Sequence, residues 1–331
     1  MNRTVAYSLP LILFLSACGG GSSSPAGIQP PTGSGTGLVI TSTNAKPAVR
    51  SAYGSAQQSM NTGGMVTGAG LVAGSGGGLQ KLHLEARLPD LLTRAMQKDP
   101  LGPDVTDCDA GGTTTITGEV ANPQLLSPGD QINVESMDCD NGLGAVANGR
   151  LEMTVVSFDF DLATLGFLLV MNVQLVDFEV VTATDTILSN GDSMVTIDLT
   201  GNPLAVTSIT GNSLTVQTNS ETETNSNFSS MQTVDTSVSP QPYTLESSGT
   251  INSTELGGVI TYATPVTFQG LGTDYPFAGE FLVTGANGAS IRLIALDSTN
   301  VRIDTDTNGD GTVDLMEDTT WADIAPQPQL L

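Results

Sequence analysis

The chain has 331 residues, with 34 Asp and Glu against 10 Lys and Arg, and a formal net charge of −24. This balance excludes a protein that binds nucleic acid through basic patches, because neutralising phosphates requires clustered Lys and Arg. The single histidine excludes zinc sites that take two histidines from one chain. Gly, Ser, Thr, Asn and Asp are abundant and aromatic residues are scarce, which favours a β-rich domain over a helical bundle.

The first 17 residues have the plan of a secretory signal peptide, with Arg3 as a positive start and an apolar stretch over residues 5–14. That stretch is too short to span a bilayer as a stable helix. The sequence Leu15-Ser16-Ala17-Cys18 follows, and it resembles the lipobox of bacterial lipoproteins. The resemblance implies that residues 1–17 are removed and that Cys18 carries the acyl chains. Because no Asp follows Cys18, it also implies anchoring in the outer membrane. The alternative is an ordinary signal peptide with a chance cysteine.

Composition divides the rest of the chain into three parts. Residues 18–38 are mostly Gly, Ser, Pro and Thr, and we expect them to form a flexible tether. Residues 39–106 contain six basic and four acidic residues, whereas residues 107–331 contain three basic and thirty acidic ones. Since the two parts have opposite charge, we expect the weakly basic segment to pack on or near the acidic domain.

The weakly basic segment has mixed patterns. Residues 39–41 have the composition of a short strand, and residues 45–60 suit a helix that begins near Pro47. Apolar residues then alternate with polar ones over residues 81–88, which predicts a strand that contains the single histidine, His83. Apolar residues at helical spacing follow over residues 88–96.

From residue 107 onward the apolar pattern has a period of two. Leu151, Met153 and Val155 alternate with polar residues, and the same alternation over residues 171–180 slips by one position at Val176. A slip of one residue predicts a β-bulge. Turn signals at residues 190–192, and the sequence Thr-Gly-Asn at both 200–202 and 210–212, predict hairpins. The predicted fold class is therefore mainly β: a large antiparallel sheet of ten or more strands, closed as a barrel or folded as a sandwich.

The remaining cysteines and the single tryptophan are expected to be structural. Cys108 and Cys139 are the only pair left after processing, and a secreted chain places them in an oxidising compartment, so we expect a disulfide. Each is flanked by Asp on both sides, which disfavours the thiolate of a catalytic nucleophile. Trp321 is expected to pack the C-terminal segment onto the sheet.

Residues 306–317 read Asp-Thr-Asn-Gly-Asp-Gly-Thr-Val-Asp-Leu-Met-Glu. This segment resembles an EF-hand calcium loop, which takes oxygen ligands from positions 1, 3, 5, 7, 9 and 12 and has glycine at position 6. The resemblance implies calcium as the cofactor, with the ligands Asp306, Asn308, Asp310, Thr312, Asp314 and Glu317. The flanks depart from the family, because residues 301–304 have a strand pattern and no second loop follows. We therefore expect a calcium loop on a β scaffold; the alternative is an acidic turn without metal.

No motif of a catalytic nucleophile is present: there is neither a GxSxG elbow nor a Ser-x-x-Lys sequence. A hydrolase with paired carboxylates stays open as an alternative, but we expect no catalysis. The sequence favours a lipid-anchored, calcium-binding envelope protein with a structural, adhesive or surface-binding role. Calcium would stabilise the domain or bridge it to an acidic polymer. The alternative is an envelope carrier of an apolar ligand, such as a lipid, inside a β-barrel.

Overall fold

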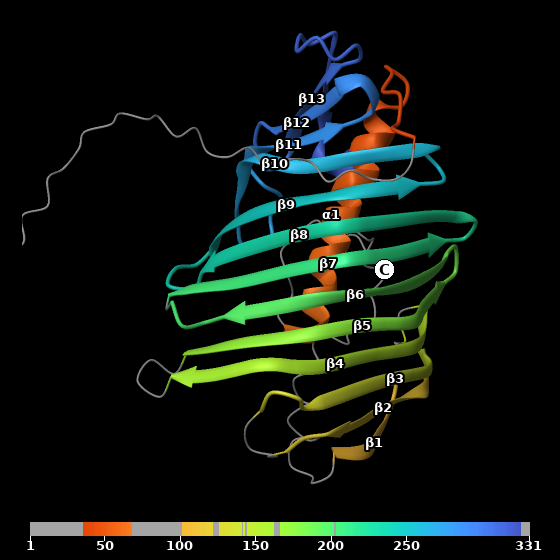
Figure 1. Ribbon diagram of the computed structural model, residues 1–331, viewed down its shortest axis with the longest axis vertical. Helices are drawn as coiled ribbons and strands as arrows, with labels where there is room; N and C mark the ends of the chain where they lie inside the picture. Colours follow the sequence, from red (N-terminus) through yellow and green to blue (C-terminus); the bar gives the residue numbers. More distant parts are fainter. Residues whose placement is uncertain are drawn as a thin grey trace, which may run out of the picture.

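The computed structural model describes residues 36–67, 101–121, 126–140, 142, 144–161, 166–201 and 203–325. Within these residues, 14 antiparallel strands form one sheet in which each strand pairs with its neighbours in sequence. Figure 1 shows the strands stacked in chain order, with helix α1 running across them. The prediction of a large antiparallel sheet is confirmed. Because β1 and β14 do not pair, the sheet is not closed, and it fits the folded alternative rather than the barrel.

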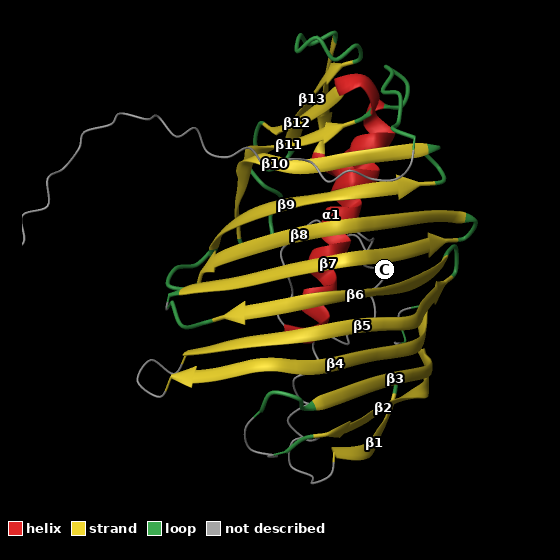
Figure 2. Ribbon diagram, in the orientation of Figure 1, coloured by secondary structure: helices red, strands yellow, loops and turns green. Residues whose placement is uncertain are grey.

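The strands have the following bounds: β1 (Leu101–Asp107), β2 (Gly111–Glu119), β3 (Gln131–Asp140), β4 (Ala145–Asp161), β5 (Gly166–Thr182), β6 (Thr186–Asp198), β7 (Leu204–Thr218), β8 (Glu221–Asp235), β9 (Pro242–Ser253), β10 (Gly258–Leu271), β11 (Ala278–Thr284), β12 (Ser290–Ala295), β13 (Asn300–Asp306) and β14 (Leu315–Thr320). The sheet thus begins six residues before residue 107, where the charge balance changes. Figure 2 shows how strands dominate the described part of the chain.

Helix α1 (Ala45–Thr67) confirms the helix predicted over residues 45–60 and extends it. Its buried residues recur every three or four positions, so that one apolar face packs on the sheet against β7 to β12. The described part of the weakly basic segment that forms α1 therefore lies on the acidic domain. Among the described residues, no helix is long and apolar enough to cross a membrane.

The strand predicted over residues 39–41 is wrong. Only Gly37 forms a β-bridge in this region, with Val259. The chain then turns because the side chain of Asn44 accepts from the backbone N–H of Thr41 at 2.8 Å and donates to the carbonyl of Val39 at 2.9 Å. These bonds direct the backbone into α1. The strand and helix predicted over residues 81–96, His83, the signal peptide and Cys18 lie outside the described residues.

Two hydrophobic clusters support the sheet, one on β2 to β8 and one between α1 and β9 to β13. Trp321 begins the short helix α3 (Trp321–Ile324) and is fully buried in the second cluster. Its ring centroid lies 5.2 Å from that of Tyr53 and 5.7 Å from that of Tyr275. Its indole N–H donates to the carbonyl of Pro276 at 2.9 Å. The prediction that Trp321 packs the C-terminal segment onto the sheet is confirmed.

The bulge predicted at Val176 is confirmed. The register between β5 and β6 shifts between Leu175 and Phe178, and Asp177 has a φ of 46°. Neighbouring strand pairs shift in register too, β3 with β4, β4 with β5, and β6 with β7. Repeated bulges bend strands, which gives the open sheet its folded form.

Two of the predicted turns are wrong. Residues 200–201 do form the turn between β6 and β7, but residues 190–192 lie inside β6 and residues 210–212 lie inside β7. Glycine serves close packing at the second Thr-Gly-Asn sequence: a Cβ on Gly211 would lie 2.1 Å from Cζ of Phe228 and 2.7 Å from the carbonyl oxygen of Asp192. A glycine inside a strand can mark a site of close approach and need not mark a turn.

The expected disulfide joins Cys108, just after β1, to Cys139 near the end of β3, with Cα atoms 5.4 Å apart. The hydroxyl of Thr114 on β2 lies 3.5 Å and 3.4 Å from the two sulfur atoms. The bridge therefore fastens the first three strands at one end of the sheet.

Candidate functional site

The candidate calcium loop connects the last two strands of the sheet. β13 and β14 pair in regular register from Asn300↔Thr320 to Thr305↔Leu315, so the strand pattern predicted before the loop is confirmed. Residues 307–314 form the connection. Gly309 and Gly311 have φ values of 75° and 84°, a conformation that glycine adopts without strain. The loop is thus the turn of a β-hairpin.

Asp306 organises the first half of this loop. Its side chain is buried at the end of β13, with 7% exposure. Oδ1 accepts from the N–H groups of Asn308 at 3.2 Å and Gly309 at 2.7 Å, and Oδ2 accepts from the N–H of Gly311 at 2.8 Å. The carboxylate at the first predicted ligand position therefore lies at the inside of the loop.

The third and fifth positions continue this pattern. Oδ1 of Asn308 accepts from the N–H of Asp310 at 2.8 Å, and Oδ1 of Asp310 accepts from the N–H of Thr312 at 2.8 Å. The hydroxyl and N–H of Thr312 hold the pKa of the Asp310 carboxyl below its ordinary value. The carboxylate of Asp310 therefore stays charged over a wide pH range.

The last two predicted ligands have different positions. Oδ2 of Asp314 accepts from the N–H of Thr307 at 2.8 Å and from its hydroxyl at 2.6 Å, which brings Asp314 to the start of the loop. Glu317 instead lies within β14 opposite Ile303, three residues before Asp306 on the paired strand. The structure therefore brings residues 306–314 together and leaves Glu317 apart from them.

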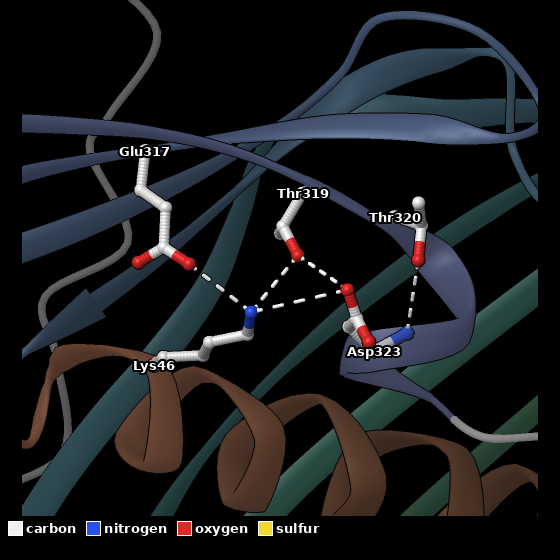
Figure 3. Close-up of polar contacts among 5 residues, drawn as sticks. All are labelled: Lys46, Glu317, Thr319, Thr320 and Asp323. Carbon is white, nitrogen blue, oxygen red and sulfur yellow. Dashed lines mark hydrogen bonds and ion pairs between the residues drawn. The ribbon is translucent and has the colours of Figure 1, made fainter.

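Glu317 belongs to a second group of polar side chains, shown in Figure 3. Nζ of Lys46 on α1 lies 3.1 Å from Oε1 of Glu317, 2.9 Å from the hydroxyl of Thr319 and 4.0 Å from Oδ2 of Asp323. The Thr319 hydroxyl also donates to Asp323 at 2.8 Å, and it is the largest of the causes that hold the Asp323 pKa low. Lys46 thereby ties α1 to β14 and α3. Sequence reasoning missed this contact because 271 residues separate Lys46 from Glu317.

Across the described residues, no three His, Cys, Asp or Glu side chains are grouped closely enough to hold a metal ion by themselves. The donors within residues 306–314 are of mixed type: three carboxylates, the amide oxygen of Asn308 and backbone carbonyls. Calcium accepts this mixture of oxygens, whereas sites built from His and Cys suit zinc. The candidate site therefore gathers the predicted ligands of residues 306–314, and Glu317 at the twelfth position lies apart from them.

No protein-family model, curated protein or solved structure matches the chain. What the chain does is therefore inferred from its own residues.

Proposed function

We propose that the chain is a lipid-anchored, calcium-binding protein of the bacterial envelope, with a structural or surface-binding role and no catalytic one. The anchor is inferred from Leu15-Ser16-Ala17-Cys18. The calcium role is carried by one observation: Asp306, Asn308 and Asp310 follow one another around a glycine turn, each accepting hydrogen bonds from the loop's own N–H groups. These bonds hold oxygen donors at alternate positions of a short hairpin loop.

The proposed ligands are the side chains of Asp306, Asn308, Asp310 and Asp314 and the carbonyl of Thr312. Calcium takes six to eight oxygens, so water completes the shell. Because Glu317 does not supply a bidentate carboxylate, we expect weak affinity, about 10⁻⁴ to 10⁻³ M, as in extracellular calcium modules. Such a site is filled outside the cell and empty at cytoplasmic calcium levels.

Calcium at this loop has two consequences. It offsets repulsion among three carboxylates and thereby stabilises the β13–β14 hairpin, by about 2.7 kcal/mol at one hundred times the dissociation constant. Asp310 and Asp314 are also exposed, so water ligands on the outer side can be replaced by carboxylates of an acidic polymer. This second consequence supports a surface-binding role for a chain of net charge −24.

The alternative of a lipid carried inside a β-barrel depended on a closed sheet. Among the described strands β1 and β14 do not pair, so the sheet they form is open. The calcium-binding envelope role is therefore the better supported of the two.

The test is thermal unfolding of residues 19–331, which contain every described residue, in about 10 mM calcium and in EDTA. We expect a calcium-dependent rise in Tm that Asp310→Ala abolishes. The matched control is Asp198→Ala, because Asp198 accepts from Thr200 as Asp310 does from Thr312 but lies outside the loop. Equal melting of the wild type in both conditions, with no heat of calcium binding by calorimetry, would remove the calcium role.

A further inference from the structure

Helix α1 carries three serines at a spacing of four residues: Ser51, Ser55 and Ser59. This spacing places them on one face of the helix. The hydroxyls of Ser51 and Ser55 donate to the two carboxylate oxygens of Glu223 on β8. Oγ of Ser59 accepts from the side-chain amide of Asn225 at 3.0 Å. Glu223 and Asn225 are two residues apart on β8, so their side chains lie on the same face of the strand. One face of the helix is therefore hydrogen bonded to one face of the strand.

Glu223 lies beside a cavity of about 440 Å³ between α1, the β7–β8 turn and the β9–β10 turn. The charged groups that line this cavity with it are Arg50 on α1, Glu221 on β8 and Glu255 in the β9–β10 turn. Tyr262 on β10 is the titratable group nearest to Asn225, and its hydroxyl oxygen accepts from the side-chain amide of Asn225 at 2.9 Å. Glu223 is therefore a partly buried carboxyl in a site with three Glu and one Arg.

Burial raises the pKa of Glu223 from its ordinary 4.5 to about 7. The Ser51 hydroxyl opposes this rise and the charge of Glu255 adds to it. A group with a raised folded pKa contributes stability that is fully present below its unfolded pKa, here 4.5, and is lost as the pH rises through about 7. The stability that Glu223 contributes to the fold therefore falls as the pH rises from 4.5 to about 7.

We propose that Glu223 is a proton-sensitive latch that holds α1 against β8 more tightly when its carboxyl is neutral than when it is charged. A neutral carboxyl donates to one serine and accepts from the other, so both contacts with the helix remain. A charged carboxyl leaves a partly buried anion near the charge of Glu255, which favours movement of α1 that admits water. At low pH α1 is thus held against β8, and at high pH this contact is weaker.

Trp321 provides a reporter of this contact, because it is the only tryptophan and packs on Tyr53, which lies between Ser51 and Ser55 on α1. Burial raises the pKa values of Tyr53 and Tyr262 far above the ordinary value, so neither tyrosine titrates in the neutral range. A histidine side chain ordinarily titrates there, and the sequence contains one, His83. The experiment therefore uses residues 19–331 with His83→Gln as the reference protein.

The emission of Trp321 is measured from about pH 5 to pH 9. We expect one transition with a midpoint near 7, where the pKa of Glu223 lies. Glu223→Gln removes it, since glutamine keeps the polar contacts but does not titrate. Glu255→Gln moves it to lower pH by removing a neighbouring charge. The matched control, Glu246→Gln, leaves it unchanged, because Glu246 is exposed and accepts from Thr267 on the neighbouring strand β10.

A flat titration of the reference protein overturns the proposal, and so does a transition that survives in Glu223→Gln. If Glu223→Gln fails to fold, amide exchange of the reference protein decides. Protection of the amides of residues 49–60, corrected for intrinsic exchange, is expected to fall about tenfold or more between pH 5.5 and pH 8.5. Equal protection at the two pH values overturns the proposal independently of any variant at position 223.

Discussion

The carboxylate of Glu317 is held 3.1 Å from Nζ of Lys46, on the side of β14 that faces α1. The residue at the twelfth position of the loop therefore joins the last strand to the helix instead of turning toward Asp306. As a result, the position of β14 is fixed by protein contacts, and calcium would bind to a loop whose far end is already in place.

In a complete EF-hand loop, substitutions at the fifth and twelfth positions would both weaken calcium binding. Here we expect the two substitutions to have different effects. Glu317→Gln is expected to change the calcium dissociation constant by less than about twofold, since the side chain is not a ligand, whereas Asp310→Ala should weaken binding about tenfold or more. Isothermal titration calorimetry measures both. Equal losses in the two variants would mean that β14 unpairs to deliver Glu317 to the metal.

Stability should depend on pH through Glu223. Its raised pKa means that the folded state binds a proton more tightly than the unfolded state, so the unfolding free energy falls as the pH rises from 4.5 to about 7. The full effect is about 3 kcal/mol. Glu223→Gln should lack this dependence and be more stable than the wild type at pH 8 in urea unfolding. Glu246→Gln is the control, and a variant that is less stable than wild type at pH 8 would contradict the sign.

Removing the disulfide should lower stability without changing the fold. The bridge closes a loop between residues 31 apart in sequence, which corresponds to roughly 4 kcal/mol in the chain-entropy model. The double variant Cys108→Ser, Cys139→Ser should lose about this amount in urea unfolding. Reduction of the wild type should give the same loss. A wild type whose unfolding free energy does not change with reductant would show that the bridge does not form in the protein.

The two Thr-Gly-Asn sequences offer a matched pair of substitutions. Gly211→Ala should cost about 1–3 kcal/mol, because the new Cβ collides with Phe228 and with the backbone of Asp192. Gly201→Ala should stay within about 0.5 kcal/mol, since the nearest atom is the carbonyl oxygen of Leu204 at 3.7 Å. Urea unfolding of both proteins checks this, and equal effects would place the second sequence in a turn after all.

The strands were predictable where one face of the sheet is buried. Met171, Val173 and Leu175 face the core, and after the bulge Phe178 and Val180 do so, which is the slip visible in the sequence. Gly191 and Gly211 were misread because glycine at a turn and glycine at a close contact have the same sequence signature. The residues on the neighbouring strand distinguish a glycine at a turn from a glycine at a close contact. A short stretch of sequence does not show which residues those are.

In the candidate site, contacts between residues close in sequence were likewise predictable, and contacts between remote residues were not. Asp306, Asn308 and Asp310 could be found because their contacts lie within six residues of one another. The contact of Glu317 with Lys46 could not be predicted, because 271 residues separate the two in sequence. The contact of Glu223 with α1 could not be predicted, because no sequence pattern sets this residue apart from the other acidic residues, 34 in all. The regular spacing of Ser51, Ser55 and Ser59 was the one local signal, and it indicates a polar helix face without identifying the strand that it contacts.

The agreement between strand order and chain order has a consequence for how the protein is made. A new strand finds its partner in the segment synthesised just before it, so the sheet can grow by local steps of low contact order. Helix α1 is the exception, because it is made before the sheet but packs against β7 to β12. Its apolar face therefore stays unprotected during folding until more than half of the strands have followed. The slowest step in folding should be the docking of the element that emerged first.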